Sequence, residues 1–161
     1  MFYQKRTRVL VVDDSSVVRE ILKRILESDQ ALEVIGEAAN GKEAVDLAFQ
    51  LNPDIITLDV HMPVMNGLEA TKQIMAYHPV PILIVSTSTL QAETHLAFEI
   101  IRAGALDVME KPTLENLPGL SASAEKLIEM VKLLSEVKVV THLAGRKGER
   151  SGKERPATSG P

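Results

Sequence analysis

Five polar side chains stand where apolar runs of the sequence end, and together they could do chemistry on phosphate. They are Asp13, Asp14, Asp59, Ser86 and Lys111. An aspartate can act as a nucleophile and form an acyl phosphate, while a hydroxyl and an ammonium group can hold phosphoryl oxygens. Whether these groups can act together depends on whether the fold brings them to one place.

The apolar runs are short, rich in β-branched residues and separated by segments in which apolar residues recur at helical spacing. We predict strands over residues 9–12, 32–36, 54–58, 82–85 and 105–110. We predict helices capped by Ser15 or Ser16, from about 40 to 51, from about 66 to 77, around 96–104, and from about 121 to 134. Strands of this kind, each followed by one helix, predict a parallel sheet covered on both faces.

This pattern is a doubly wound α/β fold, (βα)5. With the strands in the order 2-1-3-4-5, the first and third strands are neighbours, about 4.8 Å apart. Ligands of such sheets bind at the carboxyl ends of the strands, where the strand order reverses. Asp13, Asp14 and Asp59 are therefore expected to converge at that edge.

Three converging carboxylates predict a cation site. Two like charges about 4 Å apart repel by roughly 4 kcal/mol at an effective dielectric near 20, so such a cluster calls for a compensating cation. The available ligands are oxygen atoms, and the chain has no cysteine and no histidine pair at metal spacing. This chemistry favours Mg²⁺ or Mn²⁺ over zinc. Each residue alone also has an ordinary role: Asp59 as a loop cap, Asp13-Asp14 as a helix start, Ser86 as a turn residue.

The composition bounds the remaining possibilities. A chain of 161 residues fits one domain with a tail, and the absence of cysteine suits a reducing cytoplasm. Asp13 and Asp14 interrupt the first apolar run too early for a signal peptide, and no stretch approaches the roughly 18 apolar residues of a membrane span. A net charge of −4 gives no support to nucleic-acid binding. Residues 145–161 contain one apolar residue, Ala157, which predicts a flexible linker or tail.

The sequence resembles the response-regulator receiver domain over residues 6 to about 135. The motifs that carry the likeness are VLVVDDS, DIITLDVHMPVMNG, ILIVSTST and AGALDVMEKP. Within the family it is most similar to the receiver of the chemotaxis-specific protein-glutamate methylesterase, through MPVMNGLEATKQIM, the run Ser86-Thr87-Ser88, GALDVMEKPT and KLLSEVKVVTH. The resemblance implies a flavodoxin-like receiver over 6–138. Residues 139–161 are expected to be a flexible linker or tail, with the output domain of the methylesterase absent.

The resemblance also implies a role for each polar residue. Asp59 would be the phospho-acceptor for a histidine kinase, Ser86 would bond a phosphoryl oxygen, and Lys111 would pair with the phosphate. The implied Mg²⁺ ligands are Asp14 directly, Asp13 mainly through water, Asp59, and the backbone carbonyl of His61. Phosphorylation would regulate an attached or partner methylesterase domain in a chemoreceptor system.

Some positions depart from the family pattern. Val108 stands where receivers of this kind usually carry a Tyr or Phe that reports phosphorylation, so the switch is expected to use Ser86 and residues 87–90 instead. The family usually has a cis bond before the proline that is Pro112 here. His61, two residues after Asp59, lies where the family varies its dephosphorylation rate, and it could equally be an ordinary exposed loop histidine.

Other functions remain open at this point. The chain could be a stand-alone single-domain response regulator in the cytoplasm. It could also be an Mg²⁺-dependent aspartyl-phosphate phosphatase, although such enzymes generally place an acid where His61 stands. A nucleotide-binding fold is disfavoured, because neither GxxxxGK[ST] nor GxGxxG occurs, and no helix-turn-helix follows for DNA binding. The serines of the tail lie in no strand–turn–helix context that could form an esterase centre.

Overall fold

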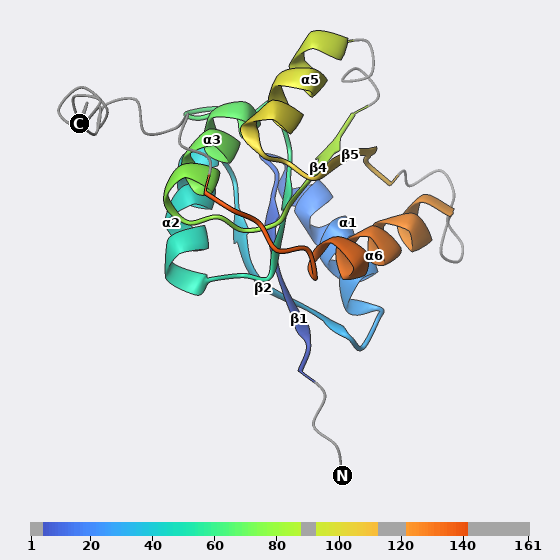
Figure 1. The fold of residues 1–161 in the computed structure, drawn as a ribbon. Coiled ribbons are helices and arrows are strands. Elements are labelled where there is room, and N and C mark those ends of the chain that lie inside the picture. Colours follow the sequence, from blue (N-terminus) through green and yellow to red (C-terminus); the bar gives the residue numbers. More distant parts are fainter. Residues whose placement is uncertain (1–4, 88–92, 113–121, 142–161) are drawn as a thin grey trace, which may run out of the picture.

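Strands and helices alternate along the chain and build one parallel sheet (Figure 1). The computed structural model describes residues 5–87, 93–112 and 122–141. Its elements are β1 (Thr7–Val12), α1 (Ser16–Glu27), β2 (Leu32–Ala38), α2 (Gly41–Leu51), β3 (Ile55–Leu58), α3 (Gly67–Tyr77), β4 (Ile82–Ser86), α5 (Thr94–Ala103), β5 (Asp107–Glu110) and α6 (Ala122–Leu134). The strand order is β2-β1-β3-β4-β5, which confirms the predicted doubly wound fold.

The sheet separates two apolar cores because successive strand residues face opposite sides. Val9 and Val11 of β1 pack with Leu22 and Leu26 of α1, in the core that α6 also lines. The alternate residues of β1 lie in the second core, which is lined by α2, α3 and α5. Among the described helices, α1 and α6 therefore cover one face of the sheet, and α2, α3 and α5 cover the other (Figure 1).

Side-chain caps fix where the first three helices begin. Ser15, Asn40 and Asn66 each accept a hydrogen bond from the backbone N–H three residues later. Loss of such a cap typically costs about 1 kcal/mol. Because Ser15 and Asn66 lie in the connections that follow β1 and β3, their caps also define the course of the loops around the acidic residues.

Some boundaries differ from the sequence-based expectation. β2 continues to Ala38 because its pairing with β1 extends to the end of that strand. β5 begins only at Asp107, since the N–H of Ala105 donates to the carbonyl of Ile100 and so helps to end α5. Within α5, Ile100 faces the core and its neighbour Ile101 is 44% exposed.

The chain continues beyond α6 along the body of the domain. Figure 1 shows this segment running from α6 toward α2 and α3, and Val139 is partly buried against the core that those helices line. A receiver ending at residue 138 and a linker over 139–161 remain predictions, and residues 142–161 lie outside the described part of the chain. Within the described ranges, every helix is too short or too polar to span a lipid bilayer.

Candidate functional site

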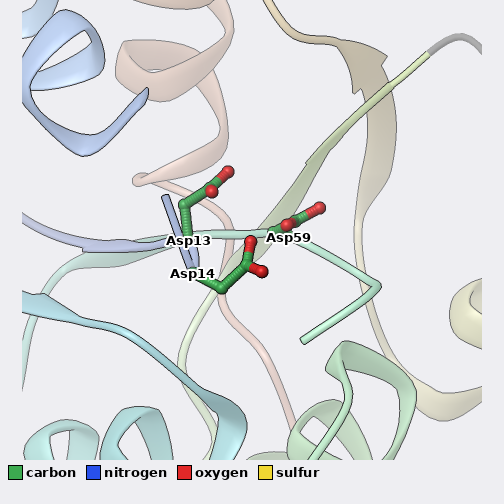
Figure 2. Close-up of side chains that lie close together, drawn as sticks. All are labelled: Asp13, Asp14 and Asp59. Atoms are coloured by element: carbon green, nitrogen blue, oxygen red, sulfur yellow. The ribbon is translucent and has the colours of Figure 1, made fainter. Parts of the chain in front are cut away.

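The three acidic residues meet where β1 and β3 end side by side. Val12 pairs with Leu58, and the N–H of Asp59 donates to the carbonyl of Val12 at 3.0 Å, which carries the ladder one residue further. Asp13, Asp14 and Asp59 each place a carboxylate oxygen within 4.8 Å of the others. Figure 2 shows the three carboxylates pointing to the same side of the strand ends. Asp13 and Asp59 are buried, whereas Asp14 is exposed to solvent.

Ser86 and Lys111 reach the same edge from the other strands. Ser86 is the last residue of β4, and its carbonyl accepts a hydrogen bond of 2.8 Å from the N–H of Lys111. The Lys111 Nζ lies 2.8 Å from Asp13 Oδ2 and 3.4 Å from Asp59 Oδ2. The Ser86 hydroxyl is buried and has no hydrogen-bond partner among the described residues. A buried hydroxyl in this state is a donor available to a ligand, because native proteins rarely leave such groups unpaired.

The loop after Asp59 folds back tightly, so that α3 starts against the acidic cluster. The N–H of Gly67 donates to the carbonyl of Val60 at 2.7 Å. A Cβ at position 67 would lie 2.2 Å from the Asp59 carbonyl oxygen, a distance that only glycine permits. Val64 has φ 67°, and the Met65 N–H donates to the Pro63 carbonyl across it, which makes a tight γ-turn.

His61 lies in this loop with an exposed side chain. The imidazole is 58% exposed, and its Nε2 lies 3.6 Å from Glu93 Oε2, next to α5. The metal ligand predicted at this position is the backbone carbonyl of His61, and that role stays a prediction. Among the described residues no peptide bond is cis, so the bond before Pro112 is trans here, unlike the cis bond that the family usually has.

Burial and neighbouring charges shift the pKa values of the two central ionisable groups, Asp59 and Lys111. Burial raises the pKa of Asp59, and the neighbouring Asp13 raises it further, against the opposing effects of Lys111 and of the Val60 N–H. Burial alone would lower the pKa of Lys111, but its contacts with Asp13 and Asp59 outweigh that effect and the net pKa is raised. The ammonium group therefore only partly neutralises the cluster, and a negative charge on Asp59 remains costly.

From this imbalance we expect the Asp59→Asn variant to be more stable than the wild type at neutral pH. The folded state binds the Asp59 proton more tightly than the unfolded state, so ionising Asp59 lowers the free energy of unfolding. The advantage of the variant should be small near pH 3, begin to grow as the pH rises above about 4, and be complete once the pH has passed the raised pKa of Asp59 in the folded protein. Its size should be about 1–3 kcal/mol, a fraction of the repulsion between two close charges.

Urea unfolding of both proteins between pH 3 and pH 8, without divalent cations, measures this difference. Adding Mg²⁺ should stabilise the wild type and so reduce the difference in the free energy of unfolding between the two proteins. A variant that is less stable than the wild type throughout this range would contradict the assigned electrostatics.

The donor set fits a hard divalent cation. Three carboxylates offer oxygen atoms within 4.8 Å of one another, and the chain has no cysteine. The exposed position of Asp14 leaves room for the water ligands that Mg²⁺ usually keeps. Asp13, Asp14 and Asp59 could therefore hold Mg²⁺ or Mn²⁺ at this edge.

Arg19 also belongs to this region, although its type and position alone do not single it out. Its Nη1 donates to the Asp13 carbonyl at 2.6 Å, and its Nε donates to Glu37 Oε1 at 3.2 Å. The only signal in the sequence is a basic residue one turn inside the helix that begins next to the acidic pair.

A family profile defines the class of protein to which the fold and site belong. The response regulator receiver domain matches residues 9–119, and the chain belongs to this family. The chain is 51% identical over 140 residues to a protein-glutamate methylesterase/protein-glutamine glutaminase of Nitrosospira multiformis, an alignment that covers 87% of this chain and 39% of that protein. A relative with the same activities in its name, from Hahella chejuensis, is 42% identical over 92% of the chain and 42% of its own length. The chain thus spans about two-fifths of the length of these relatives.

Solved structures agree with this classification. The response regulator domain of Thermotoga maritima CheB superimposes with a TM-score of 0.74 at 38% identity, covering 83% of this chain and 99% of that one. CheY in the CheX-CheY-BeF3-Mg²⁺ complex of Borrelia burgdorferi gives a TM-score of 0.66 at 27% identity, with coverages of 83% and 92%. The chain is therefore a receiver similar to that of CheB-type chemotaxis response regulators.

Proposed function

We propose that Asp59 is the phospho-acceptor of this receiver and that its phosphorylation controls a protein-glutamate methylesterase domain. The observation that carries the proposal is the position of Asp59, which is buried at the end of β3 beside two acids and 3.4 Å from the Lys111 ammonium. Burial limits the groups that can reach this carboxylate. The Lys111 ammonium lies close enough to pair with the negative charge of an incoming phosphoryl group.

In the proposed reaction, a carboxylate oxygen of Asp59 attacks the phosphorus of a phosphohistidine on a histidine kinase, or of a small acyl phosphate. A new O–P bond forms, and the donor's bond to phosphorus breaks. The donor leaves with the electron pair: the histidine of the kinase takes up a proton from water as it leaves, whereas an acyl phosphate leaves as a carboxylate. The Lys111 ammonium and the Ser86 hydroxyl bind the phosphoryl oxygens, which places the group in line with the carboxylate.

A divalent cation would supply charge neutralisation for the phosphoryl oxygens. The residues proposed to hold it are Asp13, Asp14, Asp59 and the backbone carbonyl of His61. The chemistry of this donor set supports Mg²⁺, with Mn²⁺ as a substitute. The similar CheX-CheY-BeF3-Mg²⁺ complex of Borrelia burgdorferi, which holds both BeF3 and Mg²⁺, supports the same choice.

The proposed control of a methylesterase is supported by the relatives, which carry that activity in their names. In this proposal a receiver over 6–138 is joined by a linker over 139–161 to an esterase domain, or meets one as a partner within a cytoplasmic chemoreceptor system. Phosphorylation can shift the balance between two arrangements of the receiver and esterase domains only if the phosphoryl group interacts more favourably with one arrangement than with the other.

Ser86 is proposed to carry the signal from the phosphoryl group. Val108 is partly buried in the core next to α5 and offers no ring that could change rotamer. The expected switch therefore uses the Ser86 hydroxyl and the residues after it, of which 88–90 lie outside the described part of the chain.

Beryllofluoride with Mg²⁺, a mimic of the phosphoryl group, tests this proposal by NMR. Amide shifts in the wild type should change most around Asp59 and Ser86. Ser86→Ala should weaken beryllofluoride binding by about tenfold, the cost of one charge-assisted hydrogen bond. Ser135→Ala, which removes a hydroxyl at the end of α6, serves as the control. An Ser86→Ala variant with the affinity and shift pattern of the wild type would rule out this role for Ser86.

A further inference from the structure

The Arg19 side chain ties together the end of β1, the first turn of α1 and β2. Its guanidinium donates to the Asp13 carbonyl at 2.6 Å and to the Glu37 carboxylate at 3.2 Å. The Arg19 side chain is only 17% exposed, although Glu37 lies at the surface with 38% exposed. The contact with Asp13 is therefore a sheltered one, made by a group that must give up much of its water.

Asp13 is held at four points. Its N–H donates to the Ala38 carbonyl at 3.0 Å, and its carbonyl accepts from Arg19. Its carboxylate accepts from the Ser15 N–H at 2.9 Å and pairs with Lys111 at 2.8 Å. The backbone and the side chain of Asp13 are thus both fixed.

Asp14 is different, because no hydrogen bond or ion pair holds its carboxylate among the described residues. Its direction depends on its backbone. The Asp13 carbonyl and the Asp14 nitrogen belong to one planar peptide unit, so a bond that fixes that carbonyl also fixes the start of Asp14. Through this unit the Arg19 guanidinium restrains the backbone from which the Asp14 side chain extends.

We infer that Arg19 is a positioning residue for the divalent-cation site, acting on Asp14 through the Asp13–Asp14 peptide. The inference rests on the proposed function, which places the cation on Asp13, Asp14 and Asp59. Residues that orient metal ligands without touching the metal typically change metal affinity 10–100-fold when replaced. Lysine cannot replace arginine here, since its single ammonium group cannot reproduce the planar fork that binds a carbonyl and a carboxylate together.

The direction of the change in cation affinity on replacing Arg19 distinguishes a positioning role from a purely electrostatic one. A positive guanidinium near three carboxylates opposes the binding of a cation, so removing its charge alone would tighten binding. Loss of positioning weakens binding. Arg19→Lys keeps the charge and loses the fork, whereas Arg19→Met loses both, and we expect both variants to bind the cation more weakly.

Mn²⁺ binding to the 161-residue chain, followed by the EPR signal of free Mn²⁺, tests the inference. Arg19→Lys and Arg19→Met should each raise the Kd for Mn²⁺ by about 10–100-fold. The matched control is Arg24→Met, which removes a positive charge from the same helix but affects only an exposed pair with Glu20. The control should stay within about twofold of the wild type, because exposed charges are strongly screened.

Melting temperatures measured on the same samples identify a purely structural role, which would lower stability without changing the Kd of the folded protein. If Arg19→Met does not fold, Arg19→Lys still decides the question. Unchanged or tighter Mn²⁺ binding in the folded Arg19 variants would overturn the inference. A wild-type chain that binds no Mn²⁺ would instead overturn the proposed metal site, and the inference with it.

Discussion

The Asp59→Asn variant will take up no phosphoryl label from an acyl phosphate or a phosphorylated histidine kinase, whereas the wild-type chain will take up one group. An amide is not a competent nucleophile, and loss of a nucleophile typically lowers a reaction rate by a thousandfold or more, up to about 10⁶. The other two acids do not replace it. Asp13 is already bonded to Ser15 and Lys111, and Asp14 is exposed to water.

The control for this variant is Asp46→Asn, which removes a carboxylate from the exposed face of α2. It should label like the wild type. Urea unfolding of Asp59→Asn under the labelling conditions shows that the variant is folded, so that a loss of label can be assigned to the missing carboxylate. Undiminished labelling of the Asp59→Asn variant would show that another residue is the acceptor.

A Lys111→Met variant should lose about 10²-fold in the rate of labelling. Groups that stabilise charge on a transferring oxygen typically contribute this much to a rate. The affinity of the variant for a divalent cation should not fall. The Lys111 ammonium lies 2.8 Å from Asp13 and 3.4 Å from Asp59, so it competes with a metal for the same carboxylates. Mn²⁺ should therefore bind the variant as tightly as the wild type, or more tightly.

Lys126→Met removes an exposed lysine from α6 and is the matched control for Lys111→Met. The rate of labelling, measured at saturating Mg²⁺, separates the role of Lys111 toward phosphate from any effect on the metal. A variant that labels at the wild-type rate would exclude Lys111 from the proposed reaction. A variant that labels slowly only because it no longer binds Mg²⁺ would assign Lys111 to the metal site instead.

Much of the fold follows from local pattern. Buried parallel strands read as continuous apolar runs, and Ser15, Asn40 and Asn66 are residues that cap helices well. Once the strand order is known, the pairing of Val12 with Leu58 brings Asp13 and Asp59 to the same edge. The convergence of acids could therefore be predicted from types and positions alone.

Other features depend on tertiary contacts that no local pattern contains. Lys111 lies closer to Asp13 than to Asp59, although the resemblance assigns it to the phosphate. Val64 adopts a positive φ that β-branched residues rarely take, because the loop must return quickly to Gly67. Arg19 donates to the backbone carbonyl of Asp13, and every residue has such a carbonyl, so the residue types do not reveal this contact. Side-chain types predict which groups can do chemistry, and the three-dimensional contacts decide how those groups are held.

Peptide mapping of the wild-type chain by mass spectrometry, after incubation with an acyl phosphate, tests the central proposal most directly. The incubation is done once with Mg²⁺ and once with an excess of EDTA. We expect one phosphoryl group per chain, located on the peptide that contains Asp59, and only in the sample with Mg²⁺. A label on another peptide, or equal labelling of Asp59 in EDTA, would contradict the assignment of this edge of the sheet as a cation-dependent phospho-acceptor site.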